Sequence, residues 1–191
     1  MAIHACQGKQ KGIDAMIFKS AYRTLQGFSD MVMASDGNVL TGLHFVDPRA
    51  VAKGDCAERD LPAFRETRRW LDEYFAGREP SFEPPYRIDG LTPFRRDVID
   101  AMVRIPFGET VTYGDIAAAI AKKRGVKRMS AQAVGGAVGW NPICIIIPCH
   151  RVIGANGALV GYGGGLWNKT ALLKHEQGRL PPQVGFGIMQ P

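Results

Sequence analysis

The feature that most restricts the fold is the apolar run ICIII, residues 143–147, which stands between two prolines. The run is too short and too rich in β-branched side chains for a helix, so it predicts a buried strand that ends at Pro148. Cys149, His150 and Arg151 follow directly. The sequence thus brings a thiol, an imidazole and a guanidinium to the edge of the core.

The first part of the chain is predicted to form an antiparallel sheet. Three β-rich segments are separated by turn residues: 15–25, 30–37 and 38–46. Asp36 and Gly37 form a hairpin signal between the last two. Residues 60–77 have apolar side chains at roughly helical spacing, and Gly77 is suited to end that helix. We expect the helix to lie across the sheet.

The second part of the chain is predicted to be mainly helical. Residues 78–92 are rich in proline and polar residues, which is typical of a connection between lobes. Three helices are then predicted from their starting signals: 92–103, 112–122 and 130–138. A further short amphipathic helix ends at Gly178.

The second and third of these helices have the proportions of a helix-turn-helix. Basic residues are concentrated in the turn between them: Lys122, Lys123, Arg124, Lys127 and Arg128. Such a turn suits contact with nucleic acid, and the alternative is a solvated basic loop. The net charge of +6 allows a polyanionic partner, although solubility alone also explains a modest basic excess.

These patterns predict an α+β fold with two lobes. The N-terminal lobe, residues 1–90, holds the antiparallel sheet and its helix. The C-terminal lobe, residues 91–178, is helical, with the helix-turn-helix and an active-site cysteine after a short strand. Residues 179–191 are predicted to be a tail. At 191 residues the chain can close its core without metals or disulfides.

The sequence also indicates the cellular compartment in which the protein is expected. No apolar run approaches the roughly 20 residues of a membrane span, so no membrane partner is expected. The N-terminal segment has no signal-peptide pattern, and we expect a cytoplasmic protein. In a reducing compartment the four cysteines are expected to be thiols.

Cys149 is a candidate nucleophile. Only the thiolate attacks an electrophile, and the ordinary cysteine pKa is about 8.5, so a neighbouring group must take the proton. His150 is the nearest base, but neighbours on a strand point to opposite faces, so a bridging water or a turn is needed. The alternative is a small buried hydrophobe, which is the interpretation for Cys144.

A metal site is another alternative for this segment. Cys144, Cys149 and His150 could be ligands, but their spacing is not a zinc-binding pattern and no second pair is close in sequence. His4 and Cys6 make no stronger case. We predict no metal and no other cofactor.

The segments NPICIIIPCHRVIG, GALVGYGGG and ALLKHE strongly resemble the O6-alkylguanine-DNA alkyltransferases, also called methylated-DNA-protein-cysteine methyltransferases. The motif PCHRV is highly specific, and the similarity covers about residues 91–178. The resemblance implies a single-turnover DNA-repair enzyme, a methylated-DNA-[protein]-cysteine S-methyltransferase. It would flip the damaged base and transfer the alkyl group of O6-alkylguanine irreversibly to Cys149, with O4-alkylthymine as a second candidate substrate.

The resemblance also implies roles for five side chains in the reaction. Cys149 is the acceptor, His150 is its base acting through a water molecule, and Glu176 orients the imidazole. Asn141 links the recognition helix to the nucleophile segment. Tyr113 assists flipping and donates a proton to the guanine as it leaves.

Further residues are implied to contact DNA or to shape the pocket. Arg151 is placed with the DNA contacts, although it is also expected to tie its own segment in place. The DNA-contacting set is Lys127, Arg128, Ser130, Ala131, Gln132, Ala133 and Arg151. The pocket set is Val152, Tyr162 and Gly163. The expected partner is double-stranded DNA containing O6-alkylguanine, bound by a monomer.

Two positions depart from the family pattern. Gln132 stands where relatives often carry an arginine that fills the gap left by the extruded base, and Gly163 stands where some carry serine. An amide can stack and form hydrogen bonds but lacks the attraction of a cation to phosphates. The Ala and Gly surface of residues 130–138 suits close approach to the narrow minor groove, with little sequence preference.

Two other functions compete with this reading. A Cys-His-Glu hydrolase would turn over many times and would not need the basic helix-turn-helix. A non-reacting alkyltransferase-like protein would bind lesions without repairing them, but that group lacks the acceptor cysteine, so the presence of Cys149 argues against it.

Overall fold

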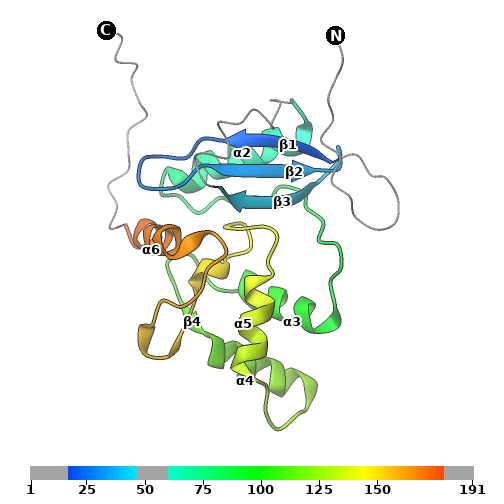
Figure 1. Cartoon of the computed structure of the whole chain (residues 1–191), viewed down its shortest axis with the longest axis vertical. Coiled ribbons are helices and arrows are strands. Elements are labelled where there is room, and N and C mark those ends of the chain that lie inside the picture. The colour runs from blue at the N-terminus through cyan, green and yellow to red at the C-terminus, as the bar shows by residue number, and fades with distance from the viewer. Residues whose placement is uncertain (1–16, 47–59, 179–191) are drawn as a thin grey trace.

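The computed structural model describes residues 17–46 and 60–178. A three-stranded sheet, covered by helix α2 (Pro62–Phe75), is stacked on a helical half that contains the other helices (Figure 1). The predicted α+β class is therefore confirmed. His4, Cys6, Cys56 and the predicted tail, residues 179–191, lie outside the described residues.

The sheet is antiparallel, as predicted. Its strands are β1 (Phe18–Tyr22), β2 (Met31–Ser35) and β3 (Leu40–Phe45), in the order β1-β2-β3. The hairpin turn lies where it was predicted. Gly37 has φ 105°, a conformation that glycine adopts without steric cost. The Asp36 carboxylate accepts hydrogen bonds from the backbone N–H groups of Asn38 at 2.9 Å and Val39 at 3.0 Å, which fixes the turn.

Helix α2 buries one face, as its apolar spacing predicted. The chain enters it through Leu61 and a proline in the first turn, where a missing N–H costs nothing. The buried face packs with the sheet side chains Met31, Met33 and Leu43 in the core. It consists of Ala63, Phe64, Thr67, Trp70, Leu71, Tyr74 and Phe75.

The helical half confirms the predicted helices with small changes in their bounds. Thr112 and Asp115 form a reciprocal capping box at the start of α4, and Ser130 accepts a hydrogen bond from the N–H of Ala133 at the start of α5. Gly125, in the left-handed region at φ 66°, ends α4. The helices are α3 (Pro93–Val103), α4 (Tyr113–Arg124), α5 (Ala131–Gly139) and α6 (Gly165–Glu176).

The strand predicted over residues 143–147 is wrong as a continuous element. The segment makes single bridges, between Leu43 and Ile143 and between Cys144 and Ile147, and Ile145 turns it at φ 70°. The side-chain amide of Asn141 causes part of this turn, because it donates to the carbonyls of Ile143 at 3.2 Å and Ile147 at 2.9 Å. The segment is therefore a buried loop that is held by hydrogen bonds.

This loop joins the two halves of the molecule. The N–H of Leu43 in β3 donates to Pro142 O, and the N–H of Cys144 donates to Leu43 O, both at 2.9 Å. After the loop come a 3-10 turn (Cys149–Arg151) and β5 (Val152–Ile153), which pairs in parallel with β4 (Val111–Thr112). A second 3-10 turn spans Ala155–Gly157.

Candidate active site

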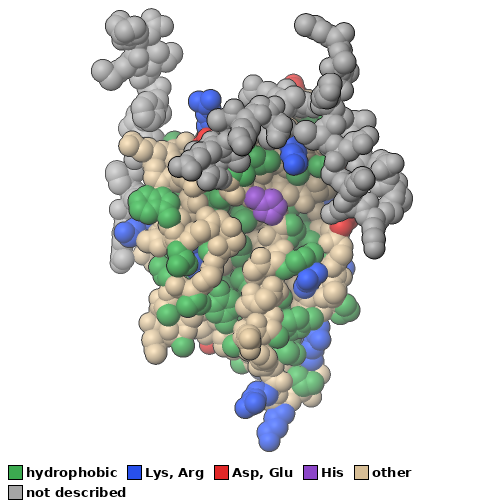
Figure 2. All heavy atoms as spheres, in the orientation of Figure 1, with side chains coloured by type: hydrophobic (Ala, Val, Ile, Leu, Met, Phe, Trp, Pro, Cys, Tyr) green, Lys and Arg blue, Asp and Glu red, His purple; other side chains and the backbone are tan. Residues whose placement is uncertain are grey.

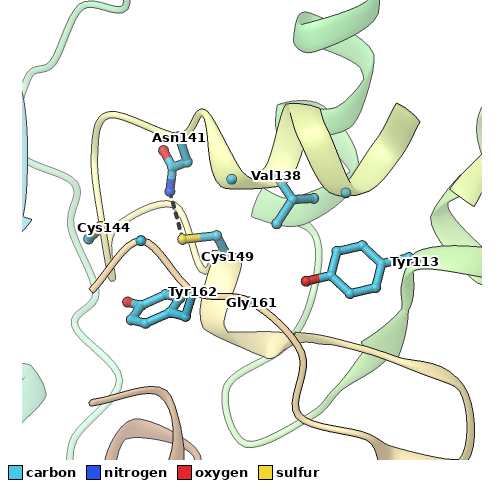
Figure 3. Close-up of a pocket in the computed structure, with 10 residues that line it drawn as sticks. Tyr113, Val138, Asn141, Cys144, Cys149, Gly161 and Tyr162 are labelled. Carbon is cyan, nitrogen blue, oxygen red and sulfur yellow. Dashed lines mark hydrogen bonds between the residues drawn. The ribbon is translucent and has the colours of Figure 1, made fainter. Parts of the chain in front are cut away.

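Cys149 is the first residue of the 3-10 turn, so it follows a turn rather than the end of a strand. The residue is buried, with 5% of its surface exposed. The side-chain N–H of Asn141 donates to its Sγ atom at 3.0 Å, and Figure 3 shows this contact across the end of α5. Asn141 therefore ties the helix end, the loop and the sulfur together.

The neighbours of Cys149 favour its thiolate. The adjacent Cys144 thiol lowers the pKa of Cys149 most, burial opposes this, and the Asn141 amide and the charge of Lys169 lower it further. The Cys144 thiol itself has a pKa well above its ordinary value, through its contact with Cys149 and through burial. Of the two thiols, Cys149 is the one that ionises first.

His150 is fully buried beside a carboxylate. Its Nε2 atom lies 2.7 Å from Oε1 of Glu176, while Nδ1 has no hydrogen-bond partner among the described residues. Burial lowers the pKa of the imidazole, and Glu176 only partly offsets this. A neutral ring with its proton on Nε2 satisfies the carboxylate and leaves Nδ1 as an acceptor.

Glu176, at the end of α6, is held from several sides. Its carboxylate accepts hydrogen bonds from the Tyr74 hydroxyl at 2.8 Å, the Gly108 N–H at 3.1 Å and two guanidinium nitrogens of Arg151 at 2.9 Å each. Burial alone would raise its pKa, but His150 and Arg151 outweigh this and lower it to about 2. The group is therefore an anion at neutral pH.

The position of Arg151 corrects its assignment to the DNA contacts. The side chain is buried, and besides Glu176 it donates to Ile105 O at 2.7 Å. All of these partners lie inside the protein, because the ion pair with the buried carboxylate draws the guanidinium inward. Arg151 ties its own segment to α6 and does not project to a nucleic acid.

A cavity of about 140 Å³ lies over Sγ. In Figure 3 the ring of Tyr113 faces Cys149 across the cavity, with its hydroxyl pointing inward. Of the three residues predicted to shape the pocket, Tyr162 and Gly163 line this cavity, whereas Val152 is buried and is not part of the lining. The lining residues are Tyr113, Gly135, Val138, Gly139, Asn141, Cys144, Cys149, Gly161, Tyr162 and Gly163.

A wider hollow of about 530 Å³ adjoins this cavity and shares Tyr113, Gly135 and Gly161 with it. Ala131 and Gln132, at the start of α5, line this hollow, and Gln132 is exposed. A bulky group seated in the hollow would therefore lie against α5 and next to the thiol. The remaining lining residues are Thr112, Gly114, Ala155 and Val160.

The basic turn between α4 and α5 is only partly free. Lys123 and Arg124 form ion pairs with Asp97 of α3, whereas Lys127 and Arg128 are exposed. Figure 2 shows basic side chains gathered at the tip of the helical half, away from the sheet. Of the other predicted contacts, Ser130 and Ala133 are exposed at the start of α5.

Two site residues were missed from the sequence, Tyr74 and Lys169. Lys169 is fully buried and donates to three backbone carbonyls near the cavity. The sequence did contain a signal for Lys169. Lys169, Leu172 and Glu176 are spaced along one face of a helix, and a lysine is rarely buried unless its charge is paired. Tyr74 gave no signal, since it contacts Glu176 from 102 residues away.

No group of three or more His, Cys, Asp or Glu side chains in the described ranges could hold a metal ion. None of the helices in those ranges is long and apolar enough to cross a membrane.

Two family models match this chain. Residues 93–178 match "6-O-methylguanine DNA methyltransferase, DNA binding domain", and residues 30–88 match "6-O-methylguanine DNA methyltransferase, ribonuclease-like domain".

Curated relatives carry a consistent name. The methylated-DNA-protein-cysteine methyltransferase of Mycobacterium bovis is 41% identical over 164 residues, which cover 85% of this chain and 96% of the relative. The protein of that name from Methanosarcina acetivorans is 50% identical over 113 residues, 59% of this chain and 69% of the relative.

Solved structures agree with these matches. The Mycobacterium tuberculosis O6-methylguanine methyltransferase has a TM-score of 0.68 and 38% identity, covering 87% of this chain and 96% of that one. A structure of M. tuberculosis OGT in complex with DNA has a TM-score of 0.69 and 38% identity, covering 86% and 95%. Both halves of the fold are matched over nearly the whole length of these relatives, and the chain belongs to the methylated-DNA-protein-cysteine methyltransferase family.

Proposed function

We propose that this protein repairs DNA by moving the alkyl group of O6-alkylguanine to Cys149. The observation that carries the proposal is a buried thiol, hydrogen-bonded by Asn141, at the wall of a cavity that adjoins the exposed start of α5. Family membership and the DNA complex of a relative support the same reaction and the same partner. O4-alkylthymine is a second candidate substrate.

The proposed chemistry is a displacement at the alkyl carbon. The Cys149 proton passes through a water molecule to Nδ1 of His150, whose Nε2–H is held by Glu176. The thiolate then forms an S–C bond as the bond between the carbon and O6 breaks, and the electron pair goes to the guanine. Burial and the charge of Cys149 raise the pKa of Tyr113, so its hydroxyl keeps a proton to give to the leaving base.

The product explains why each molecule would work once. A thioether has no carbonyl for water to attack, unlike the thioester of a cysteine hydrolase, so the acceptor is not regenerated. A multiple-turnover hydrolase is therefore not favoured. A non-reacting lesion-binding protein is not favoured either, because the acceptor thiol is present in the site.

The target atom must leave the duplex before it reaches the thiol. A base inside the stack cannot bring its alkylated oxygen to a thiol buried at the wall of this cavity, and turning the base out costs a few kcal/mol. The small residues Ala131, Gly135 and Gly139 of α5 support close approach to the minor groove. Gln132 is proposed to fill the space left by the base, and Lys127 with Arg128 to contact phosphates.

Three further assignments complete the proposal. Residues 91–178 form the DNA-binding and acceptor lobe and residues 1–90 the N-terminal lobe, a division supported by separate family matches that end at 88 and begin at 93. The protein acts as a monomer. It works in the cytoplasm, where a reducing environment keeps a nucleophilic thiol from oxidation.

The test is mass spectrometry of the intact protein after it is mixed with an oligonucleotide containing O6-methylguanine. One methyl group should appear per protein, on the peptide that contains Cys149. The Cys149→Ser variant should bind the same DNA without acquiring the methyl group, because a hydroxyl ionises far less readily than a thiol. Repaired DNA in several-fold excess over protein would overturn the single-use mechanism.

A further inference from the structure

Lys169 is a buried lysine that the proposed mechanism does not use. It lies on α6 with none of its surface exposed, and burying an ammonium is costly unless it is paired. Its Nζ atom donates to three backbone carbonyls: Val152 at 2.7 Å, Val160 at 3.2 Å and Gly161 at 3.4 Å. The Val152 carbonyl belongs to β5, which follows Cys149 in sequence by three residues. The other two carbonyls belong to the loop that reaches the cavity at Gly161.

The three acceptors indicate that Lys169 is charged. An ammonium has three N–H donors and no acceptor, whereas a neutral amine would turn its lone pair toward one of the carbonyl oxygens. The ring of Tyr113, 5.9 Å from Nζ, adds a further favourable contact for a cation. Burial lowers the pKa of Lys169, and a negative charge on Cys149 raises it.

Lys169 has no carboxylate partner in the described part of the chain. The anion on its own helix, Glu176, is already paired with Arg151 and hydrogen-bonded to His150. The Arg151–Glu176 pair is neutral as a whole, so with a protonated thiol the buried site carries an excess charge of about +1 from Lys169. Release of the thiol proton from this site to solvent removes the excess.

The other titratable groups around Cys149 do not supply a negative charge that would balance Lys169. Cys144 and Tyr162 from neighbouring loops and Tyr113 from α4 have raised pKa values, and burial keeps His150 neutral. Helix α5 presents only apolar or glycine residues to the cavity: Gly135, Val138 and Gly139. Among the described residues, Lys169 is therefore the unbalanced charge at this site.

We propose that the Lys169 ammonium is the counter-ion of the Cys149 thiolate, and that its three hydrogen bonds fix the nucleophile segment relative to the loop of Val160 and Gly161. The inference rests on the proposed function, since alkyl transfer needs the thiolate. It makes Lys169 a positioning and electrostatic residue that acts behind the cavity without touching the substrate.

The experiment titrates the thiolate directly. Ultraviolet absorbance of the thiolate is followed against pH in the protein and in its Cys149→Ser variant, and the difference gives the pKa of Cys149. Lys169→Gln keeps N–H donors without charge and should raise this pKa by about one unit or more. Lys169→Arg keeps the charge and should stay near the parent. Lys174→Met, at an exposed site on the same helix, is the matched control.

The rate of methyl transfer from an O6-methylguanine oligonucleotide is measured over the same pH range. With Lys169→Gln the rate should fall by up to about tenfold at neutral pH and recover as pH rises, because more of the thiol then ionises. An unchanged titration with a rate lowered equally at every pH would overturn the proposal and leave Lys169 a structural residue. The titration needs no substrate, so absence of transfer in the parent protein would count against the function alone.

Discussion

Tyr74 connects the N-terminal lobe to the reacting groups, and Tyr74→Phe tests that connection. The hydroxyl donates to Oε1 of Glu176 at 2.8 Å, and both residues are buried. Phenylalanine keeps the ring and its contacts with Trp70 and Phe75, so only the hydrogen bond is lost.

The loss of stability follows from the partners of the carboxylate. A hydrogen bond to a charged group contributes about 1.5 to 3 kcal/mol. Glu176 keeps donors from Gly108, His150 and Arg151 after the change, so we expect the low end, about 1.5 kcal/mol. For a chain of this size that corresponds to a fall in Tm of about 3 to 6 °C.

The matched control is Tyr22→Phe. The Tyr22 hydroxyl also donates to a carboxylate at 2.8 Å, but the acceptor, Asp72, is exposed and water can replace the donor. Denaturant unfolding should therefore show a larger loss for Tyr74→Phe than for Tyr22→Phe. Methyl transfer should slow only in Tyr74→Phe, because only there does the carboxylate that orients His150 lose a partner. Equal losses in both variants, with equal transfer rates, would refute the reasoning.

Three other changes probe separate parts of the proposed site. Gln132→Ala should slow repair in duplex DNA far more than reaction with free O6-alkylguanine, where nothing is flipped; equal slowing would mean that Gln132 supports the pocket instead. Changing Lys127 and Arg128 to Gln should weaken DNA binding at every sequence and flatten its dependence on salt, measured by titration at several ionic strengths. Glu176 has its pKa lowered on folding to about 2, so it stabilises the fold above its unfolded value near 4.5 and loses this as pH falls toward 2. Glu176→Gln should therefore show a shallower loss of stability in acid unfolding over that range, and an identical acid limb would contradict the assignment.

Local signals in the sequence predicted most of the helical half. The capping residues Thr112 and Ser130 act on N–H groups three residues away, so their effect is readable without knowing the fold. The hairpin at Asp36 and Gly37 is equally local. The motif around Cys149 indicated the proposed nucleophile because the residues next to it in sequence, His150 and Arg151, are themselves a base and a cation.

Long-range contacts account for what the sequence did not predict. Residues 143–147 have strand propensity, but the Asn141 side chain and β3 bind the segment at single points and turn it at Ile145. The inward direction of Arg151 depends on Glu176, 25 residues later. Neither β3 nor Glu176 can be identified as a partner from the sequence around these residues, so propensity alone could not place them.

Contacts between the two halves show that the N-terminal half helps to hold the proposed reaction site in place. From β3, Leu43 exchanges backbone hydrogen bonds with Pro142 and Cys144 on the loop that precedes the thiol. From α2, Tyr74 holds the carboxylate that pairs with the imidazole. The N-terminal half thus supports, at two separate points, the loop before the proposed nucleophile and the carboxylate beside its proposed base. A helical half without the sheet would lose both supports at once, so the two halves work as one site although they are matched by separate family models.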